Sequence, residues 1–158
     1  GHDEEISKEQ AIERGLVTRE EWTELEEACL KLYDFYRREA KSRGIIVADV
    51  KLEFGRADEG LIQIDEPVTH DSARLWLEKY YTPGRSQESN CLDKEYLRGY
   101  LRRIGYTGDG EPPRLSRPII RQVALRVKGA YEVLAGIRSA SDLDLLSLEE
   151  LVGSVEEK

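Results

Sequence analysis

The feature that most constrains the fold is a change of residue pattern near position 45. Before it, apolar residues recur at three- and four-residue steps from Trp22 to Tyr36, the spacing of an amphipathic helix with one face towards the core. The run IIVADV at 45–50 is then β-branched and almost wholly apolar, and alternation of polar and apolar residues follows it. Segments with both periods in one chain predict an α+β fold, an antiparallel hairpin packed with several helices.

Local signals divide the chain into three parts. Capping boxes, in which Gln or Glu follows a Ser or Thr by three residues, open helices at Ser7, Thr18 and Ser147. We expect one domain over 1–158, made of a helical part (8–43), a β-hairpin (45–66) and a second helical part (71–152).

Two details of the second helical part can be checked directly. An Asp71–Ser72 cap predicts a short helix that carries Leu75 and Trp76. The last long helix, which starts at Ser116, has apolar residues at helical spacing. The expected buried stripe of that helix consists of Ile120, Val123, Ala124, Val127, Tyr131 and Leu134.

Composition excludes several classes of protein. The formal net charge of -8 disfavours general binding to nucleic acid or to anionic membranes. Only Cys29 and Cys91 are present, so neither a disulfide framework nor a zinc site is indicated, and a reducing, cytoplasmic location is expected. No apolar run has the length of a spanning helix or of a signal peptide, which predicts a soluble protein.

Acidic side chains gather in the predicted hairpin. Asp49, Lys51 and Glu53 alternate along one strand and therefore share a face. If Glu53 lies opposite Gln63 on the second strand, Asp65 lies opposite Lys51 on that same face. Carboxylates brought together in this way suit magnesium that carries nucleotide phosphates. The same alternation is typical of any half-exposed hairpin, so the pattern alone leaves a purely structural role open.

Sequence motifs favour the chemical role. The passages GIIVADVKLEFG and LIQIDEPVTHDSARLW resemble the signature region of the phosphoribosylaminoimidazole-succinocarboxamide synthase (SAICAR synthetase) family. The agreement includes D-x-K-x-E-F-G at 49–55, I-D-E at 64–66 and D-S-x-R at 71–74. It is weaker in HDEEIS at 2–7 and in LDKEYLRGYL at 92–101.

The resemblance implies an ATP-dependent carbon–nitrogen ligase of purine biosynthesis. ATP would phosphorylate the carboxylate of carboxyaminoimidazole ribotide, and the amine of L-aspartate would displace phosphate to give SAICAR. By position in the motifs, Glu53 and Asp65 would hold the Mg²⁺ of ATP, and Lys51 and Asp49 would be catalytic residues facing the ribotide. Arg74 would bind phosphate.

Other residues have smaller implied roles. Ser72, Asp71, Asp3 and Lys94 would contribute to substrate binding by the same resemblance. His70 receives no role. A basic group near the last long helix is interpreted as a solvated face; it consists of Arg114, Arg117, Arg121, Arg126 and Lys128.

The resemblance covers only the C-terminal lobe of a two-lobe fold that is similar to kinases and ATP-grasp enzymes. No glycine-rich phosphate loop occurs in these residues, and methionine is absent. We therefore expect the N-terminal ATP-binding lobe to be a further partner and this chain to be inactive alone. A homo-oligomer is possible.

Two other functions stay open. A small-molecule kinase of the inositol-phosphate type also carries D-x-K on a strand near a metal-binding aspartate, but it would not use L-aspartate. A non-catalytic binding module could keep this fold without the ATP lobe.

Overall fold

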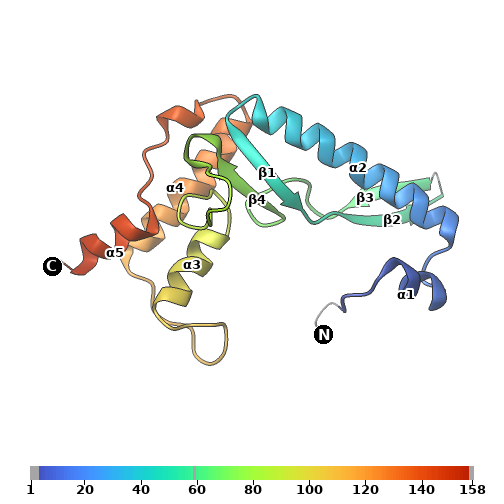
Figure 1. The fold of residues 1–158 in the computed structure, drawn as a ribbon, viewed down its shortest axis with the longest axis horizontal. Helices are drawn as coiled ribbons and strands as arrows, with labels where there is room; N and C mark the ends of the chain where they lie inside the picture. Colours follow the sequence, from blue (N-terminus) through green and yellow to red (C-terminus); the bar gives the residue numbers. More distant parts are fainter. Residues whose placement is uncertain (1–3, 59, 157–158) are drawn as a thin grey trace.

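The computed structural model describes residues 4–58 and 60–156 and confirms the α+β class. In Figure 1, α2 and the ribbon of β2 and β3 extend to one side, whereas α3, α4 and α5 gather on the other. The elements are α1 (Lys8–Glu13), α2 (Arg19–Lys41), β1 (Ile45–Val50), β2 (Glu53–Ala57), β3 (Gly60–Ile64), β4 (Ala73–Leu77), η1 (Glu78–Tyr80), α3 (Glu95–Arg103), α4 (Arg117–Leu134), η2 (Ala140–Asp142) and α5 (Leu148–Glu156).

The three predicted capping boxes are confirmed. In each, the hydroxyl accepts a hydrogen bond from a backbone N–H three residues later, and the side chain at that later position accepts one from the capping residue. The pairs are Ser7 with Gln10, Thr18 with Glu21, and Ser147 with Glu150. Replacing such a cap by alanine costs about 1 kcal/mol, so these local contacts help to fix where the helices begin.

The first strand does not form the predicted hairpin. β1 pairs antiparallel with β4, so that Ile45 lies opposite Leu77. The helix expected from the Asp71–Ser72 cap is also wrong, because Ala73–Leu77 is a strand. A helix-cap signal depends only on neighbouring residues, whereas a strand forms because it pairs with a distant segment. Here the pairing with β1 buries Leu75 and Leu77 completely.

β2 and β3 instead form a separate two-stranded ribbon. Glu53 lies opposite Ile64, so the predicted pairing of Glu53 with Gln63 is wrong by one residue. A shift of one residue exchanges the two faces of a strand. The side chain of Gln63 instead accepts a hydrogen bond from the Tyr36 hydroxyl of α2 at 3.3 Å. Alternation along this ribbon therefore does not bring Glu53 and Asp65 to one face.

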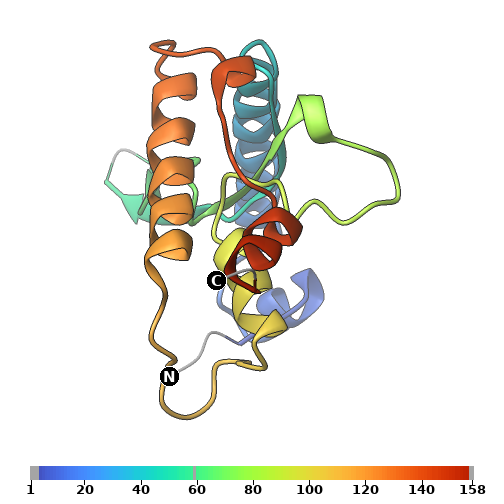
Figure 2. The same ribbon diagram turned by 90° about the vertical axis from the view of Figure 1, so that its left-hand side faces the viewer.

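Two apolar clusters form the core. The larger lies where β1 and β4 meet α2 and α4, and it consists of Ala40, Ile45, Val47, Ala73, Leu75, Leu77, Leu92, Ala130, Val133, Ala140 and Leu143. The smaller joins α3, α4 and α5 and consists of Cys91, Tyr96, Ile119, Leu148 and Leu151. Figure 2 shows α4 and α5 nearest the viewer with α2 behind them, and the segment after β4 projecting away from the helices.

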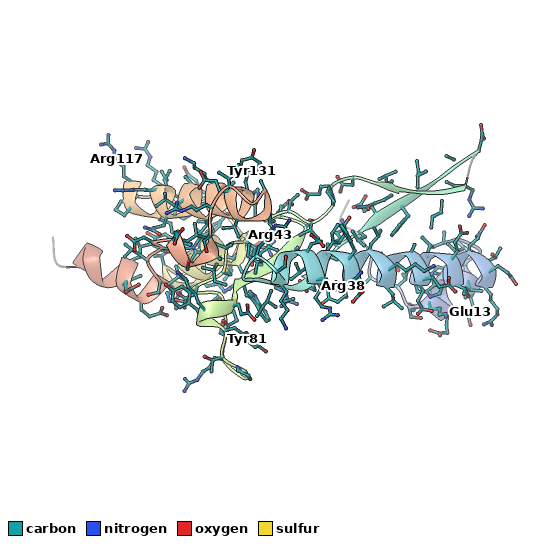
Figure 3. All side chains as sticks on the ribbon, turned by 90° about the horizontal axis from the view of Figure 1, so that it is seen from above. Glu13, Arg38, Arg43, Tyr81, Arg117 and Tyr131 are labelled. Carbon is teal, nitrogen blue, oxygen red and sulfur yellow. The ribbon has the colours of Figure 1, made fainter. Side chains whose placement is uncertain are left out.

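The predicted stripes of the long helices need correction. On α4, Ile120 and Tyr131 are 52% and 65% exposed, and Figure 3 shows Tyr131 on the outer side of the helix. The buried side of α4 consists of Ile119, Gln122, Arg126, Gly129, Ala130 and Val133. The stripe of α2 is half-buried, because that helix extends beyond the β1–β4 sheet. Over the described residues, no helix is long and apolar enough to cross a membrane.

Arg126 is not on a solvated face, as the sequence had indicated. Its side chain is 1% exposed, and its guanidinium lies 3.4 Å from the centre of the Tyr96 ring. It donates to the carbonyls of Cys91, at 3.1 Å, and Leu146, at 2.6 Å, and to the side-chain oxygen of Gln122, at 2.8 Å. Burial lowers the pKa of this guanidinium. The four contacts tie the segment before α3 to α4 and to the segment before α5.

Candidate active site

A cavity of about 630 Å³ lies where the end of β1, the start of β4 and the start of α3 meet. Most of the predicted site residues line it: Asp49, Lys51, Asp65, Asp71, Ser72, Arg74 and Lys94. Glu53 adjoins the cavity through an ion pair of 2.6 Å with the ammonium of Lys51. Asp3 lies outside the described residues.

A β-bulge at Ala48 places Asp49 in this cavity. Val47 lies opposite Leu75, but Asp49 lies opposite Arg74, so that Ala48 is an extra residue in β1. Without it, Asp49 would share the inward face of Ile45 and Val47; the bulge reverses the alternation. The hydroxyl of Tyr33 on α2 donates to the carbonyls of Val47 and Ala48, which holds the bulge.

Asp49 and Arg74 form a multiple ion pair. The Nε of Arg74 donates to both carboxylate oxygens at 2.9 Å, and an NH2 group of the same guanidinium also contacts Oδ2. Hydrogen bonding from Arg74 holds the pKa of Asp49 below its usual range. Both side chains are about half exposed, at 50% and 54%, so the pair fixes orientation more than it stabilises the fold. The outer edge of the guanidinium can still reach an anion.

Asp65 has an unusual backbone conformation. Its φ of 60° is the only positive φ of a non-glycine residue in the described ranges. Such a conformation is uncommon and slightly strained for an L-residue, although aspartate tolerates it better than most. This conformation ends β3 and turns the chain. The turn, and not the alternation of side chains along a strand, places Asp65 in the lining of the cavity.

The turn after Asp65 is held by hydroxyl groups. Thr69 donates to Glu66 at 2.6 Å. Ser72 donates to the carbonyl of Pro67 at 2.5 Å and accepts from the backbone N–H of Thr69 at 2.9 Å. Because its hydroxyl proton is used in the turn, Ser72 can offer a ligand its oxygen only as an acceptor.

The start of α3 forms the opposite wall. The ammonium of Lys94 lies 2.9 Å from a carboxylate oxygen of Asp71, and this contact lowers the pKa of Asp71. Asp93 is buried and accepts hydrogen bonds from the backbone N–H groups of Leu75, at 2.7 Å, and Glu95, at 2.9 Å. Burial raises the pKa of Asp93 in spite of these two bonds. Asp93 therefore joins β4 to α3 beneath the cavity.

The predicted site did not include four charged residues that also line the cavity, Glu66, Asp93, Glu95 and Arg98. Each lies within a motif already noted, Glu66 in I-D-E and the other three in the motif at 92–101. In the part of the chain that the structure describes, the lining thus carries six acidic and four basic side chains. Such a mixture suits a ligand that bears phosphate and carboxylate groups together with a cation or an amine. His70 lines a smaller neighbouring cavity of about 180 Å³.

The fit of a metal ion depends on the donors present. Within 4–58 and 60–156, no group of three or more His, Cys, Asp or Glu side chains could hold a metal ion. Magnesium that is bound with nucleotide phosphates needs only one or two carboxylates, because phosphate and water oxygens complete its shell. Asp65 in the cavity and Glu53 beside it fit magnesium in that form, and not as an ion held by protein ligands alone.

Comparison with known proteins gives consistent matches. Residues 1–115 match the family model described as SAICAR synthetase. Phosphoribosylaminoimidazole-succinocarboxamide synthase of Rhodopirellula baltica is 38% identical over 136 residues, covering 86% of this chain and 41% of that protein. The enzyme of the same name from Pichia angusta is 43% identical, covering 85% of this chain and 43% of that protein.

Solved structures agree in fold. The SAICAR-synthase from Saccharomyces cerevisiae complexed with SAICAR has a TM-score of 0.74 and 36% identity, covering 85% of this chain and 44% of that one. A SAICAR synthetase in complex with ADP has a TM-score of 0.61 and 26% identity. The chain thus spans less than half the length of these relatives. Because the family model matches most of its residues and the fold agrees, the chain belongs to the SAICAR synthetase family.

Proposed function

We propose that the polypeptide containing this chain joins L-aspartate to carboxyaminoimidazole ribotide at the expense of ATP, giving SAICAR, ADP and phosphate. The observation that carries this proposal is the convergence of Asp49, Lys51, Asp65, Arg74 and the start of α3 on one cavity. Family membership supports the same reaction, as do relatives solved with SAICAR and with ADP.

The reaction needs two transfers. A carboxylate oxygen of the ribotide attacks the γ-phosphorus of ATP and the bond to ADP breaks, which leaves an acyl phosphate. The amine nitrogen of L-aspartate then attacks the acyl carbon. The bond between that carbon and the phosphate oxygen breaks, phosphate leaves with its electron pair, and the nitrogen loses a proton. Lys51 is exposed at the cavity and is suited to donate to the carboxylate and to the phosphoryl oxygens as negative charge develops there.

The remaining residues bind and orient. Asp49 faces the imidazole nucleotide and fixes the guanidinium of Arg74, whose outer edge binds phosphate. Lys94 and Asp71, already paired, are placed to contact the carboxylates and the amine of the substrates. We assign Ser72 and Asp3 to substrate binding as well.

Glu53 and Asp65 are the residues that would hold magnesium with ATP. When bound, the ion neutralises charge on the phosphates and makes the γ-phosphorus easier to attack. The ion pair between Glu53 and Lys51 places both charges at one edge of the cavity.

The ATP site requires protein beyond these residues. We infer that a further lobe of the same polypeptide supplies the adenine and phosphate contacts, and that this chain alone is inactive. Free cysteines at positions 29 and 91 suit a reducing cytoplasm. Assembly into a homo-oligomer is compatible with the exposed side of α4.

The test uses the full-length enzyme with Glu53→Gln and Asp65→Asn. We expect each variant to lose at least about a hundredfold in SAICAR formation with unchanged far-UV circular dichroism, because a carboxylate that would hold the magnesium of ATP is lost and the charge on the transferring phosphate is less well neutralised. Glu24→Gln, an exposed change on α2, serves as the control. Near-normal turnover in both variants would refute the metal assignment. ATP consumption that does not require L-aspartate would favour the kinase alternative, and failure to bind the ribotide would favour the binding module.

A further inference from the structure

A second cavity, of about 440 Å³, lies at the start of α4, and none of the described residues lines both it and the candidate active site. Its polar lining consists of Arg117, Arg121, Gln122 and Asp144, and the rest is leucine and proline. Figure 3 shows Arg117 at the outer surface of this end of the helix. Part of the basic group that the active site leaves without a role is therefore found here.

The orientation of Gln122 is fixed by the buried layer beneath the cavity. Gln122 is 7% exposed, and its Oε1 accepts from Arg126 at 2.8 Å and from the backbone N–H of Leu146 at 3.1 Å. Because two donors hold the oxygen, the amide NH2 group is turned the other way, towards the cavity that Gln122 lines. In the described part of the chain this NH2 group has no hydrogen-bond acceptor. The NH2 group is thus an accessible donor on an otherwise buried side chain, and its position is already set.

Two guanidinium groups stand beside that donor. Arg117 and Arg121 are exposed, one helical turn apart, and neither forms an ion pair with any described residue. The arginines of α3 behave differently, since Arg98, Arg102 and Arg103 are all paired with glutamates. Two neighbouring arginines that are not ion-paired give this part of the lining a net positive charge.

The helix itself adds to this charge. α4 is 18 residues long and has no acidic residue in its first turn, and the Ser116 side chain makes no capping bond. The positive end of the helix dipole at such a start favours an anion. Among the described residues, Asp144 is the only acidic side chain in the lining of this cavity, and it opposes an anion by repulsion.

We propose that this cavity binds a phosphate group, held by Arg117, Arg121 and the amide NH2 of Gln122. The group is either inorganic phosphate or the phosphate of a monoester whose body lies against the leucines of the wall. Guanidinium groups bind phosphate oxygens through charge-assisted hydrogen bonds, and an amide NH2 on the third side fixes the position of the group. The site is separate from the substrate phosphate site assigned to Arg74.

The experiment titrates the full-length polypeptide with inorganic phosphate and, separately, with phenyl phosphate. The readouts are calorimetry and the side-chain amide NMR signal of Gln122, which reports this cavity alone. We expect that signal to shift on saturation and Arg121→Ala to weaken binding about tenfold, the loss of one charge-assisted contact. Asp144→Asn is expected to tighten binding about threefold, because it removes a repulsive charge.

Arg114→Ala is the matched control, because it removes the same charge three residues before Arg117 and lies outside the lining. It is expected to weaken binding less than about twofold. Tighter binding of phenyl phosphate would identify a monoester as the ligand, and equal binding would identify free phosphate. Equal weakening by Arg114→Ala and Arg121→Ala, an unchanged Gln122 signal at saturation, or binding of an adventitious ion only, at concentrations far above those in a cell, would overturn the proposal.

Discussion

Replacement of Asp93 by asparagine tests whether one buried carboxylate joins the two walls of the candidate active site. Its two oxygens accept separate backbone hydrogen bonds, from Leu75 of β4 at 2.7 Å and from Glu95 of α3 at 2.9 Å. Asparagine keeps one acceptor and turns an NH2 group towards the other N–H. The loss of one charge-assisted bond and the stranding of one buried donor cost about 1.5–3 and 1–3 kcal/mol respectively.

Part of that cost is offset, because burial of the charged Asp93 carboxylate destabilises the native wild-type protein and a neutral asparagine avoids this penalty. We therefore expect a net loss of about 2–4 kcal/mol in the free energy of unfolding. The pH dependence gives a second check. Since burial raises the pKa of Asp93 in the folded state, the native protein binds more protons than the unfolded chain between the unfolded value of about 3.9 and the raised value. Wild-type stability falls as the pH rises through this window.

Asparagine does not titrate, so the difference in stability between wild type and Asp93→Asn should narrow as the pH rises through the same window. The assay is urea unfolding of the full-length enzyme followed by tryptophan fluorescence, to which Trp76 of β4 contributes beside Leu75. Asp109→Asn, the same change in an exposed loop, is the control and should shift stability by less than about 0.5 kcal/mol. A loss below about 0.5 kcal/mol for Asp93→Asn, or a difference that widens with pH, would refute the reasoning.

Two further predictions concern β1 and α4. Deletion of Ala48 should remove the bulge and turn Asp49 towards the core, so that SAICAR formation by the full-length enzyme is lost. A deletion variant with wild-type turnover would show that the bulge does not place Asp49. Ile119→Ala should cost about 2–5 kcal/mol in unfolding free energy, whereas Ile120→Ala, on the exposed side, should cost less than about 0.5 kcal/mol; denaturant unfolding with equal losses would contradict the orientation of α4.

The sequence predicted best what depends on neighbouring residues. Capping boxes at Ser7, Thr18 and Ser147 involve residues three apart, and all three are present. Most of the residues that line the cavity were also predicted, because they lie in the motifs that carry the family resemblance. Those motifs name residues without saying how the chain brings them together.

What could not be predicted depends on distant partners. β1 pairs with a segment more than twenty residues away, which alternation alone cannot identify. The bulge at Ala48 and the positive φ of Asp65 have no distinct residue pattern, yet both direct side chains into the cavity. The buried side of α4 was missed because Gln122 and Arg126 occupy positions where a count of apolar residues finds nothing.

Ala48 also divides β1 into two stretches in which opposite positions, odd before it and even after it, tolerate only apolar residues. Before it, the odd positions Ile45 and Val47 are enclosed and must stay apolar; after it, the odd position 49 faces solvent and the even position, Val50, packs on the core. A lineage that gains or loses one residue here would exchange a carboxylate that faces the cavity for a side chain of the core. Length at this strand is therefore under as much constraint as the identity of its residues.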